Sequence, residues 1–117
     1  MISRVAKILM LTTALLVPTG APTALTEPPQ PEVRLENESV RVTIWKFQPG
    51  AGMGRHMGIE PELGIVVEGE LMLETAKGRE PLRPGSVYWV SGLTPHDVRN
   101  GGSGSATMWD VLLKRCQ

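Results

Sequence analysis

The 117-residue chain has few of the residues that cross-link or ligate in small domains, with one cysteine, Cys116, and two histidines, His56 and His96. A lone cysteine cannot form a disulfide within the chain, so Cys116 is either a free thiol or half of an intermolecular bridge. Excess charge is also absent, because 12 basic residues balance 12 acidic ones. This balance excludes the positive footprint of a nucleic-acid-binding or lipid-binding protein, and we expect no nucleic-acid partner.

The apolar run from Ile8 to Val17 is too short to cross a bilayer, which requires about 20 residues. Two basic residues precede it, and small residues follow it up to Ala21 and Ala24. This pattern is typical of a secretory signal peptide over residues 1–24, cleaved after Ala21 or Ala24. We therefore expect a periplasmic or secreted protein with no stable membrane insertion after cleavage. An uncleaved anchor is the alternative. No cysteine directly follows the run, so a lipoprotein acceptor is missing.

The rest of the chain lacks any sustained helical period, and short alternating segments replace it. Three prolines within residues 25–32 predict a linker, and residues 33–115 are expected to form one all-β domain, a sandwich or barrel. Hairpins are expected where a turn joins two runs, above all at Glu68-Gly69 and in the segment that follows Gly85. The expected strands are residues 33–35, 40–47, 63–67, 70–75, around 82, 87–90, 96–99 and 106–113.

One strand, residues 40–47, carries apolar side chains on both faces. Val42 and Ile44 share one face, and Trp45 and Phe47 lie on the other. We interpret Trp45 and Phe47 as contributing to a second packing layer or to a dimer interface. A domain of this size without an internal disulfide has little core, and dimerisation would add to it.

The two histidines lie within two spaced motifs. In a strand, His56 and position 58 would point the same way, and a turn at 59–61 would let Glu62 join them. This arrangement resembles the motif pair of the cupin family, and the resemblance covers about residues 33–113. It implies a double-stranded β-helix, also called a jelly-roll or cupin barrel, and a homodimer, which the small size and the apolar Trp45/Phe47 face support. The matching positions are Gly50, His56, Glu62 and Gly69 in the first motif and Gly85, His96 and Asn100 in the second.

The resemblance implies a divalent metal held by His56, Glu62 and His96. The chain departs from the family at Gly58, where a second histidine is usual, and at Ser91 and Leu93. Two imidazoles and one carboxylate suit Fe, Mn, Ni, Co or Zn and leave open coordination positions. Glu60 is an alternative ligand to Glu62. A metal-free pocket is the other interpretation, in which Glu62 acts as an acid or base.

A small-molecule ligand pocket is expected beside this site. Gly58 leaves room where an imidazole would stand, and Met53, Tyr88 and Met108 are the expected lining, with further candidates, more simply explained as core, at Met57, Met72 and Trp89. Arg55, Asp97 and Arg99 are expected to point away from the metal into solvent.

Two functions follow from these expectations. The first is a small-molecule-binding protein, with or without metal. The second is a metalloenzyme, dioxygenase-like or isomerase-like, acting on a small organic acid or phenol. Polar side chains in the pocket beyond the three ligands would favour the enzyme. The alternation of side chains along the strands does not clearly place any lysine, arginine or serine inside the pocket, which slightly favours the binding protein over the enzyme.

Overall fold

The computed structural model describes residues 26–115, which form eight β-strands and contain no helix with the length and apolarity to cross a membrane. The all-β prediction is therefore confirmed. The predicted signal segment, residues 1–24, and Cys116 lie outside the described residues. The strands are β1 Gln30–Glu36, β2 Val40–Phe47, β3 Glu62–Glu68, β4 Leu71–Thr75, β5 Gly78–Leu82, β6 Val87–Val90, β7 His96–Arg99 and β8 Ala106–Leu113.

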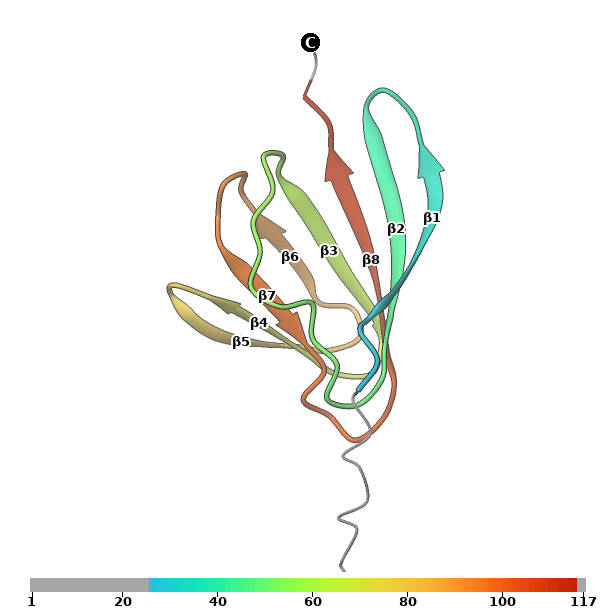
Figure 1. Ribbon diagram of the computed structural model, residues 1–117, viewed down its shortest axis with the longest axis vertical. Helices are drawn as coiled ribbons and strands as arrows, with labels where there is room; N and C mark the ends of the chain where they lie inside the picture. Colours follow the sequence, from blue (N-terminus) through green and yellow to red (C-terminus); the bar gives the residue numbers. More distant parts are fainter. Residues whose placement is uncertain (1–25, 116–117) are drawn as a thin grey trace, which may run out of the picture.

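The strands form two antiparallel sheets that face each other. One has the order β1-β2-β8-β3-β6 and the other β5-β4-β7. In Figure 1 the strands converge at one end of the molecule and spread apart at the other. Chain neighbours are often not sheet neighbours, since β8 lies between β2 and β3.

The core lies between the sheets because alternate side chains of both sheets point inward. Phe47, Val66, Leu82, Val98 and Met108 are all almost completely buried. They come from five different strands, so the core depends on pairings that are distant in the chain.

The predicted hairpins across Glu68-Gly69 and after Gly85 are wrong. Strand β3 pairs with β6 and β8, whereas β4 pairs with β5 and β7. Each of these turns instead carries the chain from one sheet to the other. Gly69 has a positive φ of 76°, and a Cβ there would overlap the Ser105 carbonyl oxygen and lie 2.7 Å from Ala106 Cα. Only glycine fits such a corner.

The linker expectation also differs from the structure at its end. Strand β1 begins at Gln30, three residues before the expected domain start at 33, and pairs Pro31 with Trp45. It is the edge strand of its sheet. An edge strand tolerates proline because not every N–H is needed for pairing.

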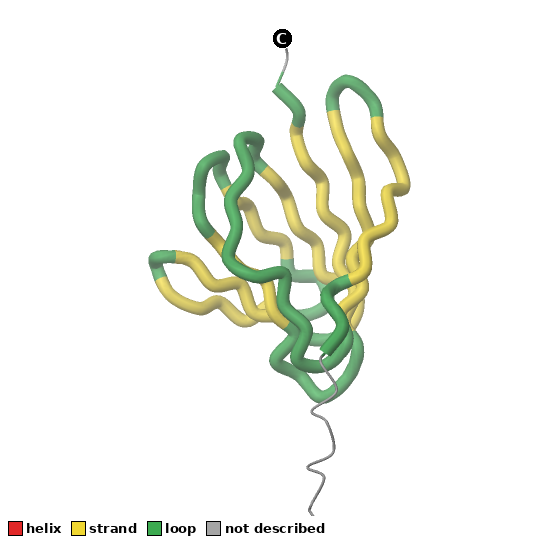
Figure 2. The backbone as a smooth tube through the Cα atoms, in the orientation of Figure 1, coloured by secondary structure: helices red, strands yellow, loops and turns green. Residues whose placement is uncertain are grey.

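The segment between β2 and β3 is not a regular strand, contrary to the geometry expected around His56. It runs as a long loop in front of the sheets (Figure 2). Isolated bridges join Gly52 to Arg99 and His56 to His96, so the loop follows the free edge of β7. Its position is therefore determined by backbone hydrogen bonds to the second motif.

Trp45 and Phe47 do not lie on an outer face. Phe47 belongs to the buried core and Trp45 packs against it. The outward residues of β2 are Val42 and Ile44, which pair with Val111 and Trp109 of β8. The expectation of two apolar faces was correct for β2, but the face assigned to a partner is the inner one.

Candidate functional site

His56 is held by the backbone of the opposite motif. Its N–H donates to the His96 carbonyl at 2.9 Å, and the His96 N–H returns a bond of 2.9 Å to the His56 carbonyl. The imidazole Nδ1 donates to the Gly54 carbonyl at 2.7 Å, since a carbonyl oxygen can only accept. Nε2 is therefore the nitrogen with a free lone pair.

His96 is oriented in the same way. Its Nδ1 donates to the Thr94 carbonyl at 2.8 Å, and the side chain is almost fully buried. The two imidazole centroids are 4.3 Å apart. Backbone tethers of this kind fix the tautomer and the ring direction of metal-binding histidines.

Glu62, the first residue of β3, completes the group. Its Oε1 lies 2.5 Å from His96 Nε2. A carboxylate oxygen and a neutral imidazole lone pair would repel at this distance, so a proton lies between them in the metal-free protein. In the metal-free protein the bond from Glu62 raises the pKa of His96, although burial opposes it. Burial acts to raise the pKa of Glu62, but the hydrogen bond and charge of His96 outweigh it, and that pKa is lowered.

The side chains of His56, Glu62 and His96 can present three ligand atoms within 4.8 Å of one another. Ligands bound at about 2.1 Å to one ion lie at most about 4.2 Å apart, so small side-chain adjustments would suffice. The donor set of two nitrogens and one oxygen fits a first-row transition metal. Within residues 26–115 no other group of this type occurs, and Glu60 is not part of it.

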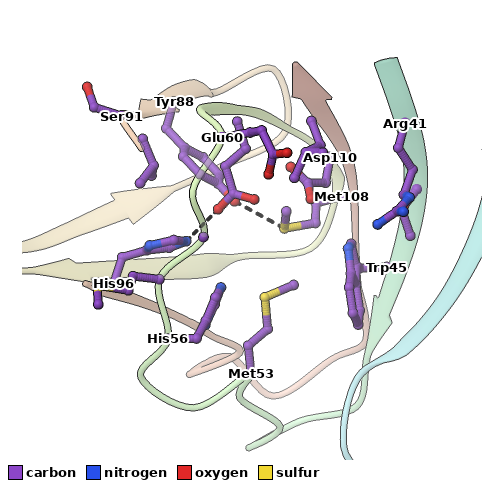
Figure 3. Close-up of a pocket in the computed structure, with 16 residues that line it drawn as sticks. Arg41, Trp45, Met53, His56, Glu60, Tyr88, Ser91, His96, Met108 and Asp110 are labelled. Carbon is purple, nitrogen blue, oxygen red and sulfur yellow. Dashed lines mark hydrogen bonds and ion pairs between the residues drawn. The ribbon is translucent and has the colours of Figure 1, made fainter. Parts of the chain in front are cut away.

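These residues open onto a cavity of about 240 Å³ between the sheets (Figure 3). All four residues expected to line a pocket, namely Met53, Gly58, Tyr88 and Met108, line this cavity, as does Met57. Met72 does not line it, and Trp89 is 53% exposed on the outside of the five-stranded sheet. The cavity volume is slightly below the usual range for drug-sized ligands, so only a small molecule fits.

The wall of the cavity at β6 depends on a glycine. Tyr88 lies across β3 at Gly64, where a Cβ would overlap its ring. The Tyr88 hydroxyl points at the Met108 sulfur at 3.6 Å. Burial raises the pKa of this hydroxyl, so it stays protonated and can only act as a neutral donor or acceptor.

Sequence reasoning missed Asp110, an acidic residue of β8 that lines the cavity. Burial raises its pKa to about 7, and the charge of Glu62 adds to this effect. One carboxyl oxygen and the Trp45 indole nitrogen are buried without a hydrogen-bond partner. The alternation of Met108, Asp110 and Leu112 was the signal that could have found it, because Met108 was itself expected to line the pocket.

The structure places an arginine and a serine in the pocket, where the alternation of side chains had not clearly placed any. Arg41, Thr43 and Ser91 line the cavity, and Glu60 joins them. Arg41 and Thr43 alternate with Trp45 on the inner face of β2, which was assigned to the wrong side.

The three charged residues that flank the histidines differ in environment. Arg55 and Arg99 are exposed as expected, and neither lines the cavity. Asp97 is buried rather than solvated, and it accepts a 3.0 Å bond from Arg99 Nε. It lies on the outward-facing side of β7 beneath its partner arginine, so it is not a ligand of the site.

Comparison with known proteins agrees with this architecture. A family model described as "Cupin domain" matches residues 43–112. The beta-alanine degradation protein BauB of Pseudomonas aeruginosa is 33% identical over 87 residues, covering 72% of this chain and 92% of that protein. The crystal structure of a cupin domain from Bordetella pertussis Tohama I has 28% identity and a TM-score of 0.66, over 77% of this chain and 97% of that one.

KdgF from Halomonas sp. has a TM-score of 0.69 at 20% identity, over 76% of this chain and 81% of that chain, and so shares the fold. Together with the two antiparallel sheets, these likenesses confirm the double-stranded β-helix expected from the motif pair. The match of the family model extends over more than half of the sequence. The chain belongs to the cupin domain family.

Proposed function

We propose that this protein binds a divalent metal through His56, Glu62 and His96 and holds a small organic ligand in the adjoining cavity. The observation that carries the proposal is the short approach of His96 Nε2 to Glu62 Oε1 in a site that His56 shares. In the metal-free protein these two acceptors share a proton, and a metal held by all three side chains would replace that proton after small side-chain adjustments.

A bound Fe, Mn, Ni, Co or Zn ion would supply Lewis acidity and open coordination positions for a ligand. The chain's own residues do the remaining work. The tethered imidazoles keep Nε2 directed at the site, Gly58 leaves space beside it, and the apolar walls limit water. Without metal, the same cavity would remain a ligand site in which Glu62 holds or accepts a proton.

The decisive experiment is elemental mass spectrometry of the purified protein, before and after loading with each metal. We expect about one metal ion per chain in the wild type and its loss in His56→Ala. Arg55→Ala is the matched control, because Arg55 is the exposed neighbour of His56 and does not line the cavity. A wild-type protein that is empty and rejects added metal would contradict the metal site and leave the metal-free alternative.

A metalloenzyme is the second candidate, and the polar residues inside the cavity favour it. Arg41, Thr43 and Asp110 could orient a substrate in addition to the three candidate ligands. The name of the Pseudomonas relative connects that protein with β-alanine degradation, which supports testing small organic acids. We would measure O₂ uptake by the Fe(II)-loaded protein over a panel of acids, catechols and diketones. No uptake across the panel would exclude dioxygenase chemistry on these substrates.

We also propose a homodimer formed through the outer face of the five-stranded sheet. One row of cross-strand neighbours on that face is apolar from β1 to β6 and a second is apolar from β2 to β6, and Leu35, Val87 and Trp89 are about half exposed. A continuous apolar face of this kind is typical of an interaction surface, and a two-fold axis could pair it with itself. Its residues are Leu35, Val42, Val111, Leu63 and Trp89 in one row and Ile44, Trp109, Ile65 and Val87 in the next.

Light scattering tests the dimer. We expect Trp89→Glu to give a monomer, because a charge would be buried at the interface. Ile59→Glu is the control, since Ile59 is 60% exposed in the loop between β2 and β3 and does not belong to this face. A wild-type monomer at tens of micromolar would refute the proposal.

Export is the last part of the proposed function, with residues 1–24 as a cleaved signal. It is supported by the basic residues, short apolar run and small residues at the start of the chain. Mass spectrometry of the protein from the periplasmic fraction should give a new N-terminus after Ala21 or Ala24. An intact N-terminus in the membrane fraction would indicate the uncleaved anchor instead.

A further inference from the structure

The cavity contains one permanently cationic side chain, Arg41, within the described residues. It projects from β2 on the five-stranded sheet, whereas His96 belongs to the opposite sheet. Figure 3 shows Arg41 on the side of the cavity away from His56 and His96. The cavity therefore has a candidate metal end and a guanidinium end.

Arg41 also lines a second, more open groove at the rim, together with Glu60 and Leu112. These three residues are common to both spaces, so the groove adjoins the inner cavity there. A molecule that enters from the rim would pass the guanidinium before it reaches the histidines.

The Arg41 side chain is 44% exposed, and its guanidinium keeps most of its donors free for a ligand that enters from the rim. Among the described residues Arg41 makes one side-chain hydrogen bond, from Nη2 to Glu36 Oε1 at 3.0 Å. The same Glu36 oxygen accepts a 3.1 Å bond from Lys114. The Glu36 carboxylate is thus shared by Arg41 and Lys114. Glu60 is a second acid, and its charge helps to raise the pKa of Arg41. A guanidinium has five N–H donors, so donors remain for a second carboxylate.

Three large, mainly apolar side chains, Trp45, Tyr88 and Met108, lie between the two ends, with Asp110 beside them (Figure 3). A ligand that spans the cavity would therefore have a short hydrocarbon segment between two polar ends. We propose that Arg41 binds the carboxylate of a small, bifunctional organic acid whose second polar group lies toward His56, Glu62 and His96. This inference rests on the proposed function for the second polar group, while the carboxylate contact depends on Arg41 alone.

The test uses the zinc-loaded protein and isothermal titration calorimetry with β-alanine, 3-hydroxypropanoate and succinate, each beside its neutral amide. We expect the wild type to bind at least one acid roughly ten- to hundredfold more tightly than its amide, the range of a charge-assisted hydrogen bond. Arg41→Gln should remove this preference and leave amide affinity and zinc content unchanged.

Lys114→Gln is the matched control, because it also breaks an ion pair with Glu36 but Lys114 lines only the rim groove. It should change the preference for acid by less than about threefold. Equal affinity for acids and amides in the wild type, an equal loss in both variants, or no binding of any of the six probes would overturn the inference.

Zinc content, measured on the same samples, separates this inference from the proposed function. A protein that takes up no zinc but still prefers acids through Arg41 would refute the metal site and preserve the carboxylate contact. A protein that takes up zinc and shows no such preference would refute the contact and preserve the metal site.

Discussion

Replacement of Gly64 by alanine tests the packing that shapes the cavity. A methyl group at this position would overlap Cε1 and Cζ of Tyr88 and lie 2.6 Å from its hydroxyl oxygen. Carbon atoms in contact prefer about 3.5–4.0 Å, so the ring would have to move by more than about an ångström. Tyr88 is only 5% exposed and packs in the core, so its ring could relieve the overlap only by moving into the cavity that it lines.

We expect Gly64→Ala to lower the free energy of unfolding by about 1–3 kcal/mol, the usual cost of overpacking a core. The entropy that alanine removes from the unfolded chain would offset about 0.4–1 kcal/mol of this. For a domain of this size the net loss corresponds to a melting temperature lower by roughly 5–15 °C. Differential scanning calorimetry and urea unfolding of the metal-free protein measure both quantities.

Gly58→Ala is the matched control, because the nearest atom to a Cβ there is the Glu60 carbonyl oxygen at 3.9 Å. It should change stability by no more than about 0.5 kcal/mol. A double-mutant cycle with Tyr88→Leu isolates the clash, since the shorter side chain should remove most of the cost of Gly64→Ala. If Gly64→Ala is harmless, or equally costly when combined with Tyr88→Leu, the Tyr88 ring does not account for the glycine.

Three further predictions concern the site and its support. Gly58→His should raise metal affinity at least about tenfold, because the added imidazole would supply a further ligand in open space. Metal competition titration measures this affinity, and an unchanged value would mean that position 58 does not face the ion. In the metal-free protein the raised pKa of His96 stabilises the fold below about pH 6.5, and this stabilisation is lost as pH rises through the folded-state pKa. The lowered pKa of Glu62 stabilises the fold above about pH 4.5, and this stabilisation is lost as pH falls through the folded-state pKa. Urea unfolding should therefore give the largest contribution of this pair near pH 5–6, and Glu62→Gln should abolish that maximum. Asn100→Ala should cost roughly 2–4 kcal/mol, because the buried amide donates to the Phe47 and Gly104 carbonyls and accepts from Gly102. Asn100→Asp would place a buried carboxylate oxygen against those two carbonyl oxygens and should cost at least as much in the same assay; a smaller loss would show that the donated bonds are not what stabilises this position.

Much of the local structure could be predicted from the order of residues alone. Alternation of side chains and the placement of glycine and proline located every strand to within a few residues, because these signals act over neighbouring positions. Spacing within the two motifs also identified the residues that meet in space, since the backbone of His56 does pair with that of His96.

Strand partners could not be predicted in this way. The turn at Gly69 looks like a hairpin in the sequence, but it carries the chain from one sheet to the other. Whether a turn closes a hairpin or crosses between layers depends on the strands already present on each side. That information is distant in the chain, as the position of β8 between β2 and β3 illustrates.

The sequence by itself determined the all-β class and the strand positions, because alternation depends on local geometry, and the resemblance of its two motifs to the cupin family supplied the three candidate ligands. Only the tertiary structure decided which face of each strand is the interior. Alternation places Arg41 on the same face as Trp45 and Asp110 on the same face as Met108, but it does not say which face of a strand is the interior one. The packing of one sheet on the other determines the interior face, and it places Arg41 and Asp110 in the lining of the cavity.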